Sequence, residues 1–94
     1  MKTWAHIKTL QAERMSKRLA KHWEHKFPVQ HAEQAFDIHM PDALVRLSPS
    51  AQELVVEISP KETSVDVIFL QKVVIEHLER MGHESLEVTW QSET

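Results

Sequence analysis

The chain has 94 residues, the length of a single domain, and it contains no cysteine, which excludes disulfides, thiolate catalysis and cysteine-bound zinc. Eleven lysines and arginines against fourteen aspartates and glutamates give a net charge of −3, which argues against a nucleic-acid-binding protein. The sequence has no signal-peptide pattern and no apolar run near the roughly 20 residues that a membrane span needs, so we expect a cytoplasmic protein with no membrane partner.

The first quarter of the chain predicts a strand followed by an amphipathic helix. Residues 2–8 alternate between side chains suited to the core and side chains suited to solvent, as in a strand with one buried face. Thr9 can cap a helix whose apolar residues then recur at helical spacing. Pro28 prevents its continuation, so we expect the helix to cover about residues 9–24.

Two side chains of this first strand suggest a binding surface on the open face of the sheet. Trp4 and His6 lie opposite the apolar side of residues 2–8, so they should stand on the sheet face that the helices leave open. His31 or His39 could join them there, and such a face could bind a flat ligand or another subunit. The alternative is that Trp4 is a shielded surface residue with no ligand.

The middle of the chain, residues 28–58, has no helical periodicity. It contains short alternating or β-branched runs that are separated by proline- and serine-containing turns. We expect an antiparallel meander of three or four strands, with extended segments starting at Val29 and covering residues 35–39, 44–47 and 53–58.

A capping signal follows the meander. Ser59 is placed as an N-cap, Pro60 at the first helical position and Glu62 at the third residue of a capping box. These residues predict a helix over about residues 60–81, and Gly82 is placed to end it.

The last segment, residues 84–91, alternates again and predicts a final strand. The element order is therefore β-α-β-β-β-β-α-β. This order predicts one α+β domain over residues 1–94, a two-layer sandwich with both helices on one face of a mostly antiparallel sheet.

The second helix carries two apolar strips. One strip suits the core, and the other lies on a different face of the helix. The second strip either packs under the first helix or forms a homodimer interface that contains Phe69 and Ile75; the two alternatives have equal support. Its members are Val65, Ile68, Phe69 and Ile75.

Histidines near the end of each helix are the candidate site. His22 and His25 are three residues apart, so they could share one metal ion if the helix persists there. The basic residues of this stretch also suit the negative end of the helix dipole, which explains them without a ligand.

His77 lies beside the core strip of the second helix and should be partly buried. If the two helices pack antiparallel, His22 and His77 could approach each other, with Glu24 or Glu79 as an orienting carboxylate. The candidate ligand-binding residues are His22, His25, His77, Glu79 and Arg80, and the candidate metal ligands are His22, His25 and His77. The alternative is a structural histidine with a satisfied hydrogen bond.

Several blocks of the sequence carry a family resemblance. Residues 19–26, 73–74, 77–81 and 86–90 resemble, with matching spacing, the bacterial family catalogued as domain of unknown function 2218. The resemblance covers essentially the whole chain, although Ala20 stands where family members often have cysteine. It implies a small bacterial cytoplasmic protein, and some members occur beside or fused to ferric-siderophore reductase-like proteins. The recurrent histidines of the family fall on His22, His25 and His77.

The leading functional hypothesis is a non-catalytic binding or accessory module that serves iron or siderophore metabolism through a protein partner. The alternative is a histidine-based metal- or haem-binding protein, so the cofactor stays open. An enzyme with His77 as general base ranks last, because no nucleophile or oxyanion-hole pattern accompanies it.

Overall fold

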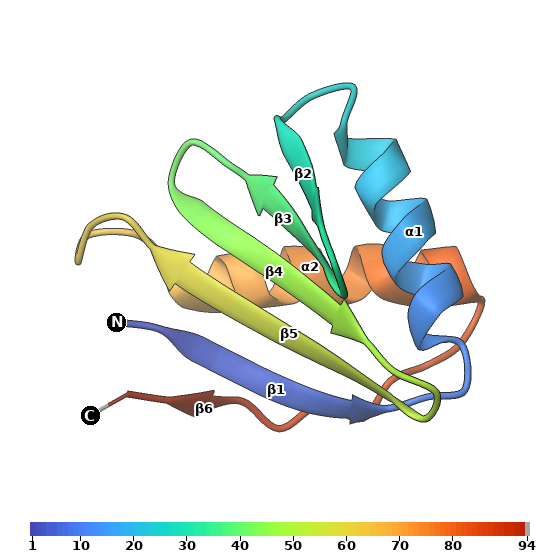
Figure 1. Cartoon of the computed structure of the whole chain (residues 1–94). Coiled ribbons are helices and arrows are strands. Elements are labelled where there is room, and N and C mark those ends of the chain that lie inside the picture. Colours follow the sequence, from blue (N-terminus) through green and yellow to red (C-terminus); the bar gives the residue numbers. More distant parts are fainter. Residues whose placement is uncertain (94) are drawn as a thin grey trace.

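The sheet runs through the whole molecule and the two helices cover one of its faces (Figure 1). The computed structural model describes residues 1–93. The elements in chain order are β1 (Thr3–Lys8), α1 (Ala12–Trp23), β2 (Val29–Ala32), β3 (Ala35–His39), β4 (Ala43–Pro49), β5 (Glu53–Pro60), α2 (Val67–Gly82) and β6 (Gln91–Ser92). This order and the two-layer α+β architecture confirm the prediction from the sequence.

The strands lie in the order β2-β3-β4-β5-β1-β6, and every neighbouring pair is antiparallel. Strands β2 to β5 form the expected meander. The first strand lies on the far side of β5, where Thr3 faces Ile58 and Ala5 faces Val56, and β6 pairs with its outer edge. None of the helices in residues 1–93 is long and apolar enough to cross a membrane.

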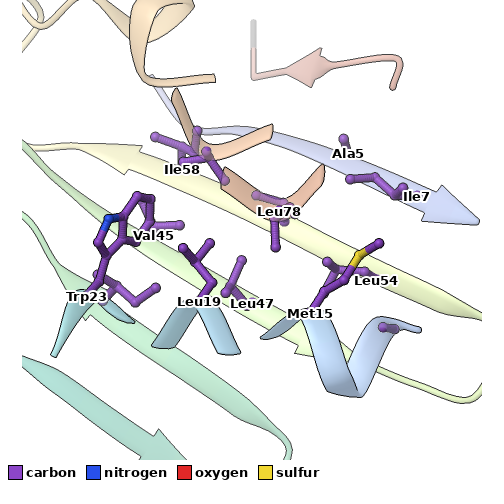
Figure 2. Packing of buried hydrophobic residues seen from close by; sticks show 14 of the residues in the cluster. Ala5, Ile7, Met15, Leu19, Trp23, Val45, Leu47, Leu54, Ile58 and Leu78 are labelled. Atoms are coloured by element: carbon purple, nitrogen blue, oxygen red, sulfur yellow. The ribbon is translucent and has the colours of Figure 1, made fainter. Parts of the chain in front are cut away.

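The core lies between the sheet and the helices (Figure 2). Strands β1, β3, β4 and β5 contribute alternate apolar residues to it, and Ala5 and Ile7 are buried as their spacing predicted. Helix α1 contributes Met15, Leu19 and Trp23 to the same cluster. Each fully buried aliphatic side chain stabilises the fold by about 1.5–3 kcal/mol, so this layer contact holds the two helices in place.

The opposite face of the sheet carries ion pairs and other polar side chains. Apolar side chains also lie on it among them, namely Trp4, Leu44 and Val55. Arg46 of β4 donates two hydrogen bonds to the carboxylate of Asp37 on β3, at 2.6 and 2.9 Å. Lys2 pairs with Glu57 at 3.0 Å. The Arg46 guanidinium holds the pKa of the Asp37 carboxyl below its ordinary value, chiefly by these hydrogen bonds.

The expectation that His31 could join Trp4 on this open face is wrong. His31 faces Phe36 in the strand register, and Phe36 faces the fully buried Leu47, so all three lie on the helix side. The His31 ring meets the Phe36 ring edge-on at 5.0 Å. His39 lies an odd number of positions from Phe36 in β3, so its side chain points to the open face of the sheet.

Helix α1 begins three residues later than predicted. Thr9 does not cap it; its hydroxyl accepts a hydrogen bond from the Gln11 backbone N–H at 3.0 Å and donates to Glu84 at 3.0 Å. Thr9 therefore shapes the turn before the helix, which starts at Ala12.

The predicted capping box at Ser59 is also wrong. Ser59 and Pro60 end β5, where they face Leu44 and Ala43 of β4. The helix begins only after Asp66, whose carboxylate accepts a hydrogen bond from the Phe69 N–H at 3.0 Å. Strand pairing over the full length of β4 outcompetes the local signal, because it satisfies more backbone groups than one cap would.

The final strand is much shorter than the predicted residues 84–91. Only Gln91 and Ser92 pair with β1. Leu86, Val88 and Trp90 are nevertheless half-buried against the core, while the residues between them are exposed. The alternating pattern thus predicted the burial of this C-terminal segment correctly and its hydrogen bonding incorrectly.

Candidate functional site

The crossing of α1 and α2 assembles three aromatic side chains, two of which are the candidate histidines His22 and His77. The rings of His22 and His77 lie 5.9 Å apart between centroids, with their planes tilted by 40°. The Trp23 ring lies 5.0 Å from His77. The expectation that the helix pair brings His22 and His77 together is confirmed.

Two hydrogen bonds hold the start and middle of α1 against the C-terminal end of α2. Gln11, before α1, donates to the Gly82 carbonyl at 3.0 Å, and Arg18 donates to the Met81 carbonyl at 3.0 Å. Further along α1, His22 meets His77, which lies earlier in α2.

His77 has one defined hydrogen bond. Its Nδ1 lies 2.7 Å from the carbonyl oxygen of Val73, one turn earlier in α2. A carbonyl oxygen only accepts hydrogen bonds, so Nδ1 carries the proton and donates. In the neutral ring Nε2 then keeps its lone pair, which is the form that binds a proton or a metal ion.

The surroundings of His77 also serve packing. Trp23 is buried at 5% exposure and meets Phe27 edge-on at 6.1 Å. His77 is half-buried against this tryptophan. The site thus combines one exposed imidazole, His22, with one that is fixed by the core.

A shared metal ion would need a modest rearrangement. With zinc–nitrogen bonds of about 2.1 Å, two imidazoles on one tetrahedral ion would have ring centroids roughly 5 Å apart, somewhat less than the 5.9 Å observed. Residues 1–93 contain no group of three or more His, Cys, Asp or Glu side chains placed to hold a metal ion. His25 is exposed, and the set of His22, His25 and His77 is not assembled as a three-ligand centre in this part of the chain.

The candidate ligand-binding residues Glu79 and Arg80 make no hydrogen bond to the histidine pair within residues 1–93. The Glu79 carboxylate accepts a hydrogen bond from the Leu86 N–H at 2.8 Å, so it holds the C-terminal segment against α2. Arg80 is exposed and lines an open polar hollow together with Glu76 and His83.

Comparison with known families identifies the family of this chain. The family model described as "Uncharacterized protein conserved in bacteria (DUF2218)" matches residues 4–91. The chain belongs to this family. A comparison with curated proteins gave no match.

A solved structure supports the fold of this DUF2218 chain. The NMR structure of PA4090 from Pseudomonas aeruginosa is 32% identical in sequence, and the match covers 96% of this chain and 94% of that one. The TM-score of 0.78 means that the two chains share the architecture described above.

The second apolar strip of α2 marks another surface of this DUF2218 protein. Ile75 is half-buried and lines a shallow groove with Leu86, Val88 and Trp90 of the C-terminal segment. Ile68 and Phe69, at the start of α2, are 74% and 61% exposed. The strip is therefore divided: the C-terminal segment lies beside its later part, and its first turn faces solvent.

Proposed function

We propose that this DUF2218 protein is a non-catalytic accessory module that binds a protein partner in the cytoplasm through the first turn of α2. The observation that carries the proposal is the exposure of two adjacent large apolar side chains, Ile68 at 74% and Phe69 at 61%. Adjacent exposed apolar side chains mark interaction surfaces more often than single ones do. The Asp66 cap holds this turn in helical form, so the backbone that carries the two side chains is fixed.

The size of the expected contribution follows from the exposed area. Complete burial of a Phe or Ile side chain is worth about 1.5–3 kcal/mol, so covering what is exposed here supplies about 1–2 kcal/mol for each. Two such anchors together contribute about 2–4 kcal/mol, or between about 30-fold and about 700-fold in affinity, which suits the centre of a modest interface.

The partner that the family resemblance supports is a ferric-siderophore reductase-like protein, which links the module to iron metabolism. A second copy of the chain would use the same surface. The homodimer interface then contains Ile68 and Phe69 rather than Phe69 and Ile75, because Ile75 is half-buried beside the C-terminal segment.

The test is the affinity of a purified reductase-like protein, encoded beside a family member, for the wild-type chain and for Phe69→Ser. We expect binding that Phe69→Ser weakens about tenfold, because a serine removes the aromatic area. Leu10→Ser is the matched control, since Leu10 is 84% exposed but lies outside α2. Equal weakening by both variants would contradict the proposed surface. Light scattering on the same samples reports whether the chain alone is a monomer or a dimer.

The histidine pair favours a second candidate, a metal- or haem-binding protein. Its support is the lone pair that the Val73 hydrogen bond leaves on His77 Nε2, in a ring 5.9 Å from His22. Two protein ligands with water in the remaining positions would bind Zn²⁺ weakly. Titrations with Zn²⁺, Fe²⁺ and haem test it: a stoichiometric ligand should raise the melting temperature, and His22→Ala should abolish that rise. A melting temperature that none of the three ligands changes would reject this candidate.

A further inference from the structure

A groove between α1 and the β4–β5 turn lies apart from the proposed partner surface and is lined by both apolar and basic side chains. It has a volume of about 860 Å³, within the range of sites for small organic molecules. In Figure 1 the start of α1 lies beside this turn. We name it the Leu10 groove; its lining consists of Leu10, Gln11, Glu13, Arg14, Lys17, Arg18, Pro49, Ser50 and Ala51.

The apolar part of the Leu10 groove includes an unusually exposed side chain. Leu10 is 84% exposed, the highest value among the large apolar residues of the described chain that face solvent. Pro49, the last residue of β4, and Ala51, in the β4–β5 turn, line the same groove. Together they offer an apolar surface to a flat or aliphatic body.

The charged part of the groove is basic, although the chain as a whole has a net charge of −3. Three cations line it against one carboxylate, Glu13, which pairs with Lys17 at 2.8 Å. Arg14 makes no ion pair and no side-chain hydrogen bond within residues 1–93. Arg18 donates one N–H to the Met81 carbonyl, and a guanidinium has four further N–H groups. Two arginines are thus available to an anion beside an apolar wall.

We infer that the Leu10 groove binds an organic anion with an apolar body, whose carboxylate or sulfonate group contacts Arg14 and Arg18 while its body lies on Leu10, Pro49 and Ala51. Charge complementarity selects the anion, since a guanidinium recognises planar or tetrahedral oxyanions with paired N–H groups. The apolar wall favours organic anions over small inorganic ones, because only an apolar body gains binding free energy by covering it.

The test compares 8-anilinonaphthalene-1-sulfonate with N-phenyl-1-naphthylamine, which keeps the rings and lacks the sulfonate. Fluorescence titration gives the affinities, and amide chemical shifts of the ¹⁵N-labelled chain locate the probe. We expect the sulfonate to bind at least threefold more tightly than the uncharged amine, with shifts at residues 10–18 and 49–51. Higher salt should reduce the difference, because the arginines face solvent.

Substitutions test the roles of the charged part and the apolar part of the groove separately. Arg14→Gln should weaken sulfonate binding about threefold to fivefold and leave the uncharged amine unchanged. Leu10→Ser should weaken both probes. Lys21→Gln is the matched control, because Lys21 is an exposed cation on α1 outside the groove lining, and its effect should be negligible. Equal affinity for the two probes, shifts confined to another surface, or an Arg14→Gln variant that binds like the wild type would each overturn the inference.

Discussion

Replacement of Gly82 by alanine should loosen the helix crossing that brings His22 and His77 together. A Cβ at this position would lie 2.9 Å from Cγ and 3.3 Å from Sδ of Met15, and it would overlap Met15 Cε. Met15 is fully buried, so its side chain has no solvent space into which it can move. Overpacking of this kind costs about 1–3 kcal/mol, while alanine returns up to about 1 kcal/mol through its helix propensity.

The expected net loss is therefore about 1–2 kcal/mol of unfolding free energy, measured by urea denaturation followed by tryptophan fluorescence. The control is the same substitution in a Met15→Ala background, where the shorter side chain leaves room for the new methyl group. There Gly82→Ala should be neutral or stabilising. If Gly82→Ala stabilises the wild-type chain, or costs the same in both backgrounds, then close packing on Met15 is not the reason for glycine at this position.

Three further predictions concern local structure. His83 holds the left-handed C-cap of α2 with φ of 51°, so His83→Gly should raise the unfolding free energy by about 0.5–1 kcal/mol in the same assay. Asp66→Ala should cost about 1 kcal/mol by removing the cap of α2, whereas Ser59→Ala should change the melting temperature little, since Ser59 lies in β5. Asp37→Asn should cost about 1 kcal/mol at pH 7, because it breaks a charged, bidentate pair with the half-exposed Arg46. The pKa of Asp37 is lowered in the folded state, so its contribution is complete above the ordinary carboxyl pKa of about 4 and is lost as the pH falls below it; denaturation curves of the two proteins should converge in that acidic range.

Strands β1 to β5 and the core were predictable because their signal is local and repeated. Ala5 and Ile7 alternate with polar neighbours, and that alternation requires one buried face whatever the rest of the chain does. The starts of the helices were not predictable in the same way. Ser59 carries a strong local capping signal, but pairing with Leu44 of a strand fifteen residues earlier keeps it in β5. A single sequence does not rank a local cap against a distant strand.

The candidate sites also differ in whether a local sequence signal predicts them. The position of His77 next to the core strip predicted a partly buried imidazole, and packing of the two helices on one face of the sheet brings it within 5.9 Å of His22. The Leu10 groove had no such signal, because Arg14 and Lys17 look like any solvated helix face until the β4–β5 turn is placed against them. Only the tertiary structure brings those cations beside an apolar wall.

The central claim is that this DUF2218 protein acts by binding a protein partner through Ile68 and Phe69. Isothermal titration of a ferric-siderophore reductase-like protein with the wild-type chain, Phe69→Ser and Leu10→Ser tests it most directly. We expect saturable binding, an approximately tenfold loss with Phe69→Ser and an unchanged affinity with Leu10→Ser. No binding by the wild-type chain, or binding that Phe69→Ser leaves intact, would contradict it.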